Sequence, residues 1–529
     1  MTCVVGFDIG TTSTIGILIR LPATVLALAS RPVDLSSPQP GWAEENPEQW
    51  WVNVCAISRE LVRRGGIDSG EIAAVGVTGM SPAVVLLDQA GTLLRPSIQQ
   101  SDGRCGAQVA ELRAECDETA FLAKAGNGIN QQLVAAKLRW VARHEPDIFA
   151  RITTVFGSYD YVNWRLTSER AVEQNWALEA GFIDVRRGQI DDGLVALAGI
   201  ARTSVPRKVG SHEILGTISA VAAGETGLKA GTPVIGGSAD MIASALGAGV
   251  VRAGDVLIKF GGAVDILTAT QRIHPDPRLY LDYHLIPGLF MPNGCMSTGG
   301  SVLNWFARTL AGGENTHAQA HNLSLHQWLD AMAAQRAAGS DGLAALPYFL
   351  GEKTPLHDPA ARGAFEGITL SHDIGHLWRA LLEAYAYAIV HHIEVLNDIG
   401  HPTERFFVSD GGAASKVWMQ IVADALQQPL QRLRGHPGSS LGVAWTAAIG
   451  IGLESDWSAI ARFVSRADRI EPNSSNAAIY RDGYRRFRDL YRRLYRPLAS
   501  MELNLAERTP TQPHSDTRSY TDGPVAQIE

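Results

Sequence analysis

The sequence predicts an α/β protein with two large domains. A chain of 529 residues is too long for one ordinary domain, so two domains are expected. Apolar, strand-like runs end near Asp8, Asp240 and Asp410, at broadly similar distances along the chain, and glycine-containing turns accompany all three aspartates. This repetition indicates that one α/β core occurs twice, over residues 1–248 and 249–500.

The composition argues against a nucleic-acid-binding protein. Charged residues make up 19% of the chain and hydrophobic residues 46%, which is ordinary for a globular protein. The net charge is −8 and no basic block is present, so a surface for nucleic acid is not expected. Residues 505–529 are polar and rich in Thr, Pro and Ser, which predicts a disordered tail.

Targeting and membrane signals are also not expected. The N-terminus has no basic segment and carries Asp8 within its apolar stretch, which argues against a signal peptide. Residues 15–29 are apolar but interrupted by Arg20 and Pro22, so the run is too short to span a membrane. The five cysteines are scattered without a CxxC spacing, which argues against a zinc site and favours a reducing cytoplasm as the compartment.

The first element is expected to be a β-hairpin. Two apolar runs, residues 4–9 and 15–19, flank the turn Gly10-Thr11-Thr12-Ser13. Backbone N–H groups and the hydroxyls of the turn can surround phosphate oxygens, and Asp8 at its mouth can hold Mg²⁺ directly or through water. The turn is not a Walker loop, because no Lys-Ser/Thr pair and no helix follow it. The alternative is an ordinary polar hairpin turn.

The next segment predicts a helix that contributes mainly to packing. Asn46 is a suitable N-cap and Pro47 a suitable first helical residue. Trp42, Trp50 and Trp51 surround this helix start. Three tryptophans in one segment more often pack than catalyse, so we expect them to be buried.

Two loops then carry candidate ligand-binding residues. Residues 72–78 are expected to form a strand that ends at the loop 79–82, and residues 83–87 to form a second strand. The following loop contains Asp102 and Arg104. A short acid beside an arginine can bind vicinal hydroxyls as acceptor and donor. The alternative is an Asp102–Arg104 ion pair at the surface, which would contribute little to stability.

The strongest chemical signal surrounds Asp240. An apolar run ends in Gly236-Gly237, Asp240 follows, and a helix of small residues leaves from this point. A helix N-terminus suits an anion such as a transferring phosphoryl group. A carboxylate at the same place can accept a hydroxyl proton, as a kinase base must. The alternative is a simple aspartate N-cap.

The second half repeats the pattern of strands followed by glycine turns. Gly261-Gly262 follows the expected strand 256–260, and Gly300 opens a helix. Gly411-Gly412 follows a further strand and precedes Ser415 and another helix. Residues 376–397 show the periodicity of a long amphipathic helix, and His391 and His392 on it are not expected to be metal ligands.

Several of these motifs, in this order, resemble the FGGY family of carbohydrate kinases. The matching segments span roughly residues 4–495 and include Asp8 to Ser13, Asp102-Gly103-Arg104-Cys105, Lys137-Leu138-Arg139-Trp140 and Gly411-Gly412. The literal string FGGY is missing, and the closest likeness is to xylulokinase-like members. The resemblance implies the actin-like ATPase (ribonuclease H-like) fold, with the catalytic cleft between its two domains.

The resemblance also implies roles for particular residues. Asp240 matches the general base, and Asp8 is the expected Mg²⁺ ligand. The sugar-contacting positions fall on Met80, Ser81, Gln100 and Asp102. The ATP-contacting positions fall on Thr11, Thr12, Ser13, Gly261, Gly262, Gly300, Gly411, Gly412 and Ser415.

The chain departs from the family pattern at three of these places. Gly261-Gly262 stands where GTS or GTT is typical, and Lys259 is the candidate to compensate for the missing hydroxyls. Ser81 stands where xylulokinases have His, and Gln100 where they have Trp. We therefore expect a sugar pocket that differs from that of typical xylulokinases.

The predicted activity is ATP-dependent phosphorylation of a sugar hydroxyl with Mg²⁺ as cofactor. The expected substrate is a ketopentose such as xylulose, or a related ketose or polyol. The altered loops leave a second hypothesis open, in which the protein binds sugar or nucleotide as a regulator. An actin-like chaperone or filament protein is a weaker third alternative, because the segments 102–104 and 137–140 resemble sugar kinases. Sugar and ATP are the expected partners, without nucleic acid or membrane. Homodimers are common in the family, although the sequence does not determine the oligomeric state.

Overall fold

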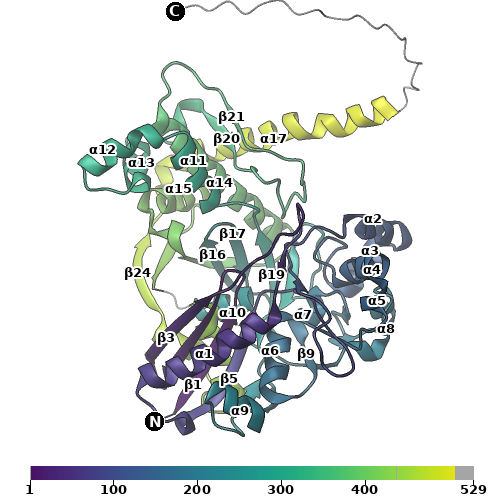
Figure 1. Ribbon diagram of the computed structural model, residues 1–529. Coiled ribbons are helices and arrows are strands. Elements are labelled where there is room, and N and C mark those ends of the chain that lie inside the picture. The colour runs from purple at the N-terminus through teal and green to yellow at the C-terminus, as the bar shows by residue number, and fades with distance from the viewer. Residues whose placement is uncertain (1, 436–437, 507–529) are drawn as a thin grey trace, which may run out of the picture.

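The computed structural model describes residues 2–435 and 438–506. Apart from its first two residues, the tail predicted for residues 505–529 lies outside the described residues. The described chain forms two α/β bodies, the lower one purple and blue and the upper one green and yellow in Figure 1. Each is built on a seven-stranded sheet.

The first sheet contains the predicted hairpin. Its strand order is β13 (Ile214–Thr217), β14 (Pro233–Ile235), β5 (Ile72–Gly79), β1 (Cys3–Ile9), β2 (Ser13–Arg20) and β3 (Thr24–Pro32), and β15 (Ser238–Ala239) pairs with β5. β1 and β2 are antiparallel, as predicted, and β1 and β5 are parallel. Ile9 pairs with Gly79, and Gly79 pairs with Ala239. The register therefore brings the residues that follow these three strands to one edge of the sheet.

The second sheet repeats this pattern. Its order is β18 (Tyr280–Tyr283), β19 (Phe290–Cys295), β17 (Val264–Thr268), β16 (Gly254–Phe260), β22 (Thr403–Ser409), β23 (Leu430–Arg434) and β24 (Ser465–Ile470). β16 is antiparallel to β17 and parallel to β22, like β1 with β2 and β5. Lys259 pairs with Asp265 on one side and with Ser409 on the other. The second sheet thus gathers charged residues at the corresponding edge.

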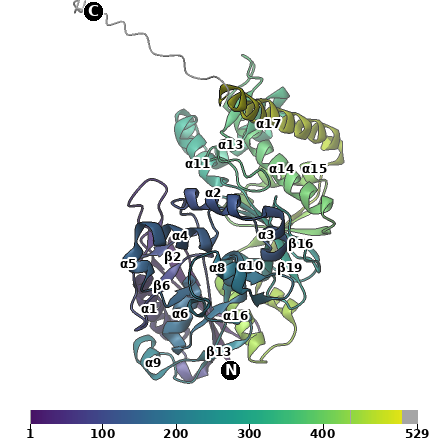
Figure 2. The ribbon, with the colours of Figure 1, turned by 90° about the vertical axis from the view of Figure 1, so that its right-hand side faces the viewer.

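Two helices pack together where the sheets meet. α10 (Asp240–Gly247) and α16 (Ser439–Gly450) share a buried apolar cluster with strands of both sheets. A Cβ atom on Gly442 would lie 1.8 Å from the carbonyl oxygen of Ala243, so only glycine permits this helix contact. α16 belongs to the second half of the sequence but packs on β1 and β5, low in Figure 2. The first sheet therefore carries a helix from the other end of the chain.

The remaining elements surround the two sheets. In the first half the helices are α1 (Pro47–Gly65), α2 (Gly106–Glu115), α3 (Glu118–Ala125), α4 (Val134–His144), α5 (Pro146–Phe149), α6 (Ser158–Thr167), α7 (Gln174–Glu179), α8 (Asp192–Ala196) and α9 (Ala220–Thr226). In the second half they are α11 (Gly300–Thr309), α12 (Asn315–Ala320), α13 (Leu325–Ala334), α14 (Ile374–Asp398), α15 (Lys416–Leu426) and α17 (Ala477–Ala506). The short strands are β4 (Glu44–Glu45), β6 (Val85–Leu87), β7 (Ser97–Ile98), β8 (Thr154–Phe156), β9 (Ala171–Glu173), β10 (Ile183–Asp184), β11 (Gln189–Ile190), β12 (Arg207–Val209), β20 (Ala344–Leu346) and β21 (Ala364–Glu366).

Local signals in the sequence are confirmed at several helix ends. The Asn46 side chain accepts a hydrogen bond from the Glu48 amide, and Pro47 is the first residue of α1. α14 covers the predicted long helix and begins at a capping box formed by Asp373 and His376. The second strand expected over residues 83–87 is shorter, because only Val85–Leu87 pairs with β8.

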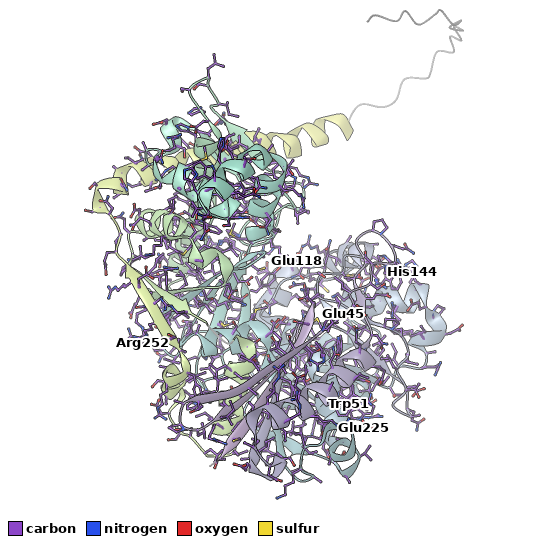
Figure 3. All side chains as sticks on the ribbon, turned by 60° about the vertical axis from the view of Figure 1, so that its left-hand side comes forward. Glu45, Trp51, Glu118, His144, Glu225 and Arg252 are labelled. Atoms are coloured by element: carbon purple, nitrogen blue, oxygen red, sulfur yellow. The ribbon has the colours of Figure 1, made fainter. Side chains whose placement is uncertain are left out.

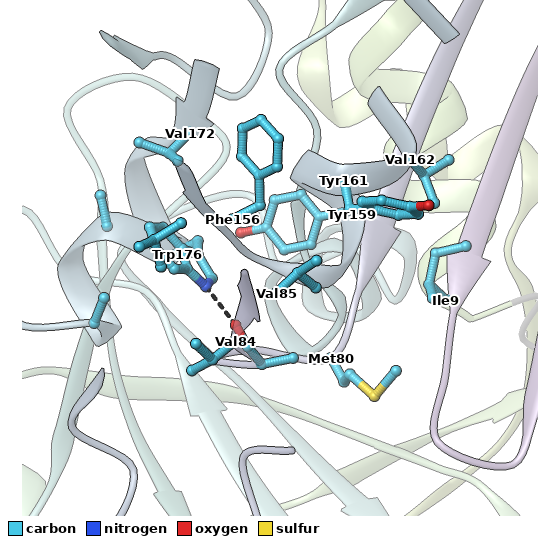
Figure 4. Packing of buried hydrophobic residues seen from close by; sticks show 14 of the residues in the cluster. Ile9, Met80, Val84, Val85, Phe156, Tyr159, Tyr161, Val162, Val172 and Trp176 are labelled. Carbon is cyan, nitrogen blue, oxygen red and sulfur yellow. Dashed lines mark hydrogen bonds between the residues drawn. The ribbon is translucent and has the colours of Figure 1, made fainter. Parts of the chain in front are cut away.

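An apolar core lies directly beneath the edge of the first sheet (Figure 4). Trp176 is completely buried and donates a 2.8 Å hydrogen bond from its indole N–H to the carbonyl oxygen of Ala83. Met80 and Ile9 lie at one end of this cluster in the same view. This packing holds the loop after β5 in place, because deep burial of large side chains is the main stabilising contribution in such cores.

The structure also answers the questions of disulfide bonds and of membrane-spanning helices. All five cysteines are free thiols. Among the described residues, no helix is long and apolar enough to cross a membrane.

Candidate active site

A cavity of about 270 Å³ lies at the edge where the two sheets meet. Five residues predicted from the sequence line it, namely Thr11, Met80, Ser81, Gln100 and Asp240. The opposite wall comes from the second half and includes Lys259, Asp265, Tyr280, Asp282, Asn293 and Lys353. Most of the residues that line the cavity have hydrogen-bonding side chains, and the cavity is smaller than the roughly 300–1,000 Å³ of sites for drug-sized ligands. Its size and lining suit a small polyhydroxylated molecule.

Asp240 is the first residue of α10. Ala239 occupies the N-cap position and makes no side-chain hydrogen bond to the helix. Asp240 is therefore not the N-cap of α10, which was the alternative considered from the sequence. Burial raises the pKa of the Asp240 carboxyl, and the charge of Lys259 and the backbone N–H of Met241 lower it. The carboxylate therefore faces the cavity in surroundings that strengthen it as a base.

Asp8 lies at the end of β1 and is held from the far end of the chain. Its Oδ2 atom accepts a 2.5 Å hydrogen bond from the Ser439 hydroxyl. Its buried Oδ1 atom has no hydrogen-bond partner among the described residues. Burial and the neighbouring Asp240 raise the pKa of Asp8 to about 7, while Ser439 and Lys259 lower it. Asp8 lines neither cavity, but it is close enough to interact with Asp240, which lines the first. Its orphaned carboxylate oxygen is a suitable ligand for a hard cation such as Mg²⁺.

The part of the chain that the structure describes contains no cage of protein ligands for a metal. Across residues 2–435 and 438–506, no group of three or more His, Cys, Asp or Glu side chains is arranged to hold a metal ion. Mg²⁺ in kinases is usually bound through one or two carboxylates, substrate phosphates and water. Asp8 is the residue here that could supply such a contact.

Lys259 is buried among four carboxylates. Asp265, Asp410, Asp240 and Asp8 all raise the pKa of its ammonium group, while burial lowers it, and the pKa lies above the usual value. Lys259 lines the cavity together with Asp240 and Asp265. It is therefore charged, and it is positioned where the two domains meet.

A second cavity of about 590 Å³ lies in the upper domain. Two consecutive residues of β16 line the two cavities, Lys259 the first and Phe260 the second. All six nucleotide-site residues predicted in the second half line it, namely Gly261, Gly262, Gly300, Gly411, Gly412 and Ser415. Trp378, Trp418 and Leu382 supply apolar surface. Glycine backbone beside apolar walls suits a flat, phosphate-bearing ligand, because a side chain would occupy the space.

The loop at Gly261-Gly262 is fixed by the start of α11. The amide of Gly300 donates to the Gly261 carbonyl oxygen at 2.9 Å, and the Ser301 hydroxyl donates to the Gly262 carbonyl oxygen at 2.8 Å. The N–H groups of Gly261 and Gly262 have no partner among the described residues. Ser415 caps α15, and its hydroxyl accepts from the Trp418 amide at 3.0 Å. The two free N–H groups are consistent with phosphate binding through backbone alone.

The hairpin turn is only partly involved in the cavities. Thr11 lines the first cavity, and its hydroxyl donates to the Met80 sulfur at 3.7 Å. Thr12 and Ser13 line neither of the two cavities. The amide of Gly10 donates to the Ser13 carbonyl oxygen at 3.1 Å and closes the turn.

Asp102 does not have the position expected of a sugar ligand. It is completely buried, lies outside the cavity lining, and forms a two-pronged ion pair with Arg104 at 2.8 and 2.7 Å. Its Oδ2 atom also accepts from the Ala43 amide at 2.6 Å. Arg104 in turn stacks 3.8 Å above the Trp42 ring. The structure thus contains the Asp102–Arg104 pair considered as the alternative, but in the interior, because Trp42 covers it.

The sequence did not point to several cavity residues. Glu179 ends α7 and Asp282 lies within β18, and neither belongs to a recognisable local motif. Lys353 follows β20 in a Gly/Pro-containing loop whose sequence indicated architecture and no ligand-binding role. Asn127 lies in the loop after α3. Only the packing of the two sheets brings these residues to the same cavity.

Known proteins match the chain over nearly its whole length. The model of the "FGGY family of carbohydrate kinases, N-terminal domain" matches residues 3–247, and that of the C-terminal domain matches residues 262–451. A xylulose kinase of Escherichia coli (strain K12) is 30% identical over 493 residues, which cover 93% of this chain and 99% of that protein. A gluconokinase of Bacillus subtilis (strain 168) is 25% identical and covers 90% and 93% of the two chains.

The structural likeness is equally extensive. The crystal structure of a xylulose kinase from Rhodospirillum rubrum superposes with a TM-score of 0.88 at 56% identity, covering 93% of this chain and 99% of that chain. The two α/β domains around a cleft are therefore the predicted fold. Together with the matches of both domain models, this shows that the chain belongs to the FGGY family of carbohydrate kinases, enzymes that phosphorylate sugars.

Proposed function

We propose that the protein transfers the γ-phosphoryl group of ATP to a hydroxyl of a ketopentose such as xylulose, or of a related ketose or polyol. The observation that carries this proposal is the position of Asp240, which lines the 270 Å³ cavity together with Lys259, while the next residue in sequence, Phe260, lines the glycine-containing cavity. The names of the E. coli and R. rubrum relatives support xylulose as the first substrate to test.

In this proposal the two cavities hold the two substrates. The sugar occupies the 270 Å³ cavity beside Met80, Ser81 and Gln100. ATP occupies the 590 Å³ cavity, with its phosphates on the Gly261-Gly262 backbone. The phosphate chain then extends past Lys259 toward Asp240 and Thr11. This arrangement sets a sugar hydroxyl in line with the γ-phosphorus atom.

Asp240 acts as the general base. The sugar oxygen forms a bond to the γ-phosphorus atom, the bond from that phosphorus to the β–γ bridging oxygen breaks, and ADP leaves. The hydroxyl proton passes to the Asp240 carboxylate. Burial supports this role, because it raises the pKa of Asp240 toward neutrality. A stronger base accepts the proton more readily as the sugar oxygen attacks.

Asp8 and Lys259 handle the negative charge of the phosphates. Mg²⁺, when bound, neutralises phosphate charge and orients the transferred group. Asp8 would hold it through the Oδ1 atom that has no protein partner among the described residues. Lys259 supplies a fixed positive charge where the typical family loop supplies hydroxyls, and its buried position strengthens that charge's effect.

The decisive experiment measures ADP release with Mg·ATP for wild type and Asp240→Asn against a panel of ketoses, aldoses and polyols. We expect stimulation by a ketopentose, and a loss of kcat of roughly 1,000-fold or more in the variant. Calorimetry should show that the variant still binds the sugar. Turnover that persists in Asp240→Asn would overturn its role as the base. Nucleotide binding without stimulation by any sugar would instead support the regulatory alternative.

A further inference from the structure

Two carboxyl groups face the sugar cavity from opposite domains. Glu179 is the last residue of α7 in the first half, and Asp282 lies within β18 in the second. Both line the 270 Å³ cavity, and α7 packs directly against β18. The two side chains are close enough to influence each other's ionisation. They are therefore one pair of groups that spans the boundary between domains.

Each carboxyl group has an unsatisfied oxygen. Oε1 of Glu179 and Oδ1 of Asp282 are buried and have no hydrogen-bond partner among the described residues. Asp282 is 1% exposed, and its Oδ2 atom accepts a 2.8 Å hydrogen bond from Asn293. Asp282 and Glu179 also lie within hydrogen-bonding range of each other, so a proton held between them and a ligand hydroxyl in the cavity can both satisfy these buried oxygens.

Neither carboxyl group is ion-paired within the described part of the chain. Within the described ranges, no lysine, arginine or histidine forms an ion pair with Glu179 or Asp282. Adjacent carboxylates in a buried site repel each other, so such a pair favours holding one proton between its two groups. Burial and the proximity of Asp282 raise the pKa of Glu179, and burial raises that of Asp282 to about 7.

We propose that Glu179 and Asp282 form a proton-sharing carboxyl pair that binds a hydroxyl of an uncharged sugar and excludes sugars carrying a carboxylate. This inference rests on the proposed sugar kinase function. A singly protonated pair offers one donor and several acceptors, which complements a hydroxyl group. A substrate carboxylate offers acceptors only and would meet the remaining negative charge.

The rest of the cavity strengthens this selection. Its acidic lining residues are Glu179, Asp240, Asp265 and Asp282, against the lysines Lys259 and Lys353. Lys259 already lies among carboxylates, two of which belong to this lining. An anionic sugar would therefore enter a site whose net charge is unfavourable, whereas a neutral ketose or polyol would not.

Three variants of the full-length enzyme separate hydrogen bonding from charge. Glu179→Gln leaves one donor amide and one carboxylate, which imitates the singly protonated pair. Glu179→Gln/Asp282→Asn removes the charge altogether. Glu179→Leu removes the hydrogen-bonding group and leaves Asp282 unpaired. Glu118→Gln is the control, because Glu118 on α3, labelled in Figure 3, lines neither cavity and has a side chain that is 54% exposed.

The measurement is kcat/KM for D-xylulose and for D-gluconate, with direct binding of both by calorimetry. Wild type, Glu179→Gln and the control should prefer D-xylulose by about 100-fold or more. In the double variant this preference should be at least tenfold smaller. Glu179→Leu should raise KM for D-xylulose roughly 10- to 100-fold. Thermal melting and ATP binding establish that each variant is folded.

Two outcomes would overturn the pair's role. One is a folded double variant whose ratio of kcat/KM for D-xylulose to that for D-gluconate is unchanged. The other is a wild-type enzyme that uses both sugars equally well, a result that can be obtained without any variant. Failure of the kinase proposal is distinguishable, because no sugar would then stimulate ADP release by wild type. Calorimetric preference for the uncharged sugar would still report on the pair in that case.

Discussion

Ser439, the first residue of α16, donates a 2.5 Å hydrogen bond to Asp8 in β1, although 431 positions separate the two residues. The bond links the candidate Mg²⁺ ligand of the first domain to a helix encoded near the end of the second. Gly6 permits this approach, since a Cβ atom there would lie 2.1 Å from the Ser440 carbonyl oxygen.

Replacing Ser439 by alanine should lower turnover, because Asp8 would lose the hydrogen bond that the Ser439 hydroxyl donates to it. A hydrogen bond to a charged group contributes about 1.5–3 kcal/mol, so we expect kcat/KM for Mg·ATP to fall roughly tenfold or more. Steady-state kinetics over a range of Mg²⁺ concentrations would measure this. Ser439→Thr keeps the hydroxyl and should retain most activity. An equal loss in both variants would point to packing around α16 instead.

Lys259→Met should lower kcat much more than it changes sugar binding. The variant removes a buried positive charge that faces the phosphoryl path, and loss of one such stabilising group typically costs 100- to 1,000-fold in rate. Rapid-quench measurement of a single turnover would test the chemical step directly. If Lys259 only neutralises its acidic neighbours, the variant will melt earlier but keep its kcat.

Gly411→Val should weaken ATP binding selectively. No atom lies within 4 Å of a Cβ placed on Gly411, so a valine fits the fold, but it projects from the lining of the 590 Å³ cavity. We expect KM for ATP to rise about tenfold while the affinity for sugar is unchanged. A tenfold change corresponds to a loss of roughly 1.4 kcal/mol of ATP binding free energy. Gly313→Val is the matched control, because its site is equally open but lies outside both cavities.

Asp102→Asn should destabilise the protein without changing its KM for sugar. The substitution breaks a buried ion pair with Arg104, and such losses cost on the order of 3–5 kcal/mol. Thermal and chemical unfolding of the full-length variant would measure the loss of stability, and initial rates of the folded enzyme would give KM for sugar. A raised KM with unaltered stability would restore Asp102 as a sugar ligand.

Glu45 should make stability depend on pH. Burial raises its pKa to about 7, while a 2.8 Å hydrogen bond from Trp50 lowers it. The folded state therefore holds this proton more tightly than the unfolded chain. Its stabilising contribution is complete below about pH 4.5 and is lost as the pH rises through about 7.

The matching variant is Glu45→Gln. It should show a shallower fall in melting temperature between pH 5 and pH 8 than wild type, with the difference between the two proteins largest at the alkaline end. Differential scanning calorimetry in matched buffers would measure both curves. Parallel curves would show that Glu45 ionises freely in the folded protein.

Local patterns predicted a large part of the fold. The hairpin β1–β2, the start of α1 at Asn46 and the long helix α14 all form as expected. These features depend on residues close together in sequence, namely alternating apolar side chains, a capping side chain and a helical repeat. The glycine turns at Gly261, Gly300 and Gly411 were likewise readable, and the structure brings them to one cavity.

The sequence by itself therefore determined the strands, their turns and the aspartates Asp8, near the end of β1, and Asp240, directly after β15. Only the tertiary structure decided that Asp102 is buried beneath Trp42, that Glu179 meets Asp282, and that Ser439 reaches Asp8. These outcomes depend on how two sheets and the helices α10 and α16 pack against one another. Burial and the partners of a side chain are properties of that packing, and residues distant in sequence carry no local signal of it.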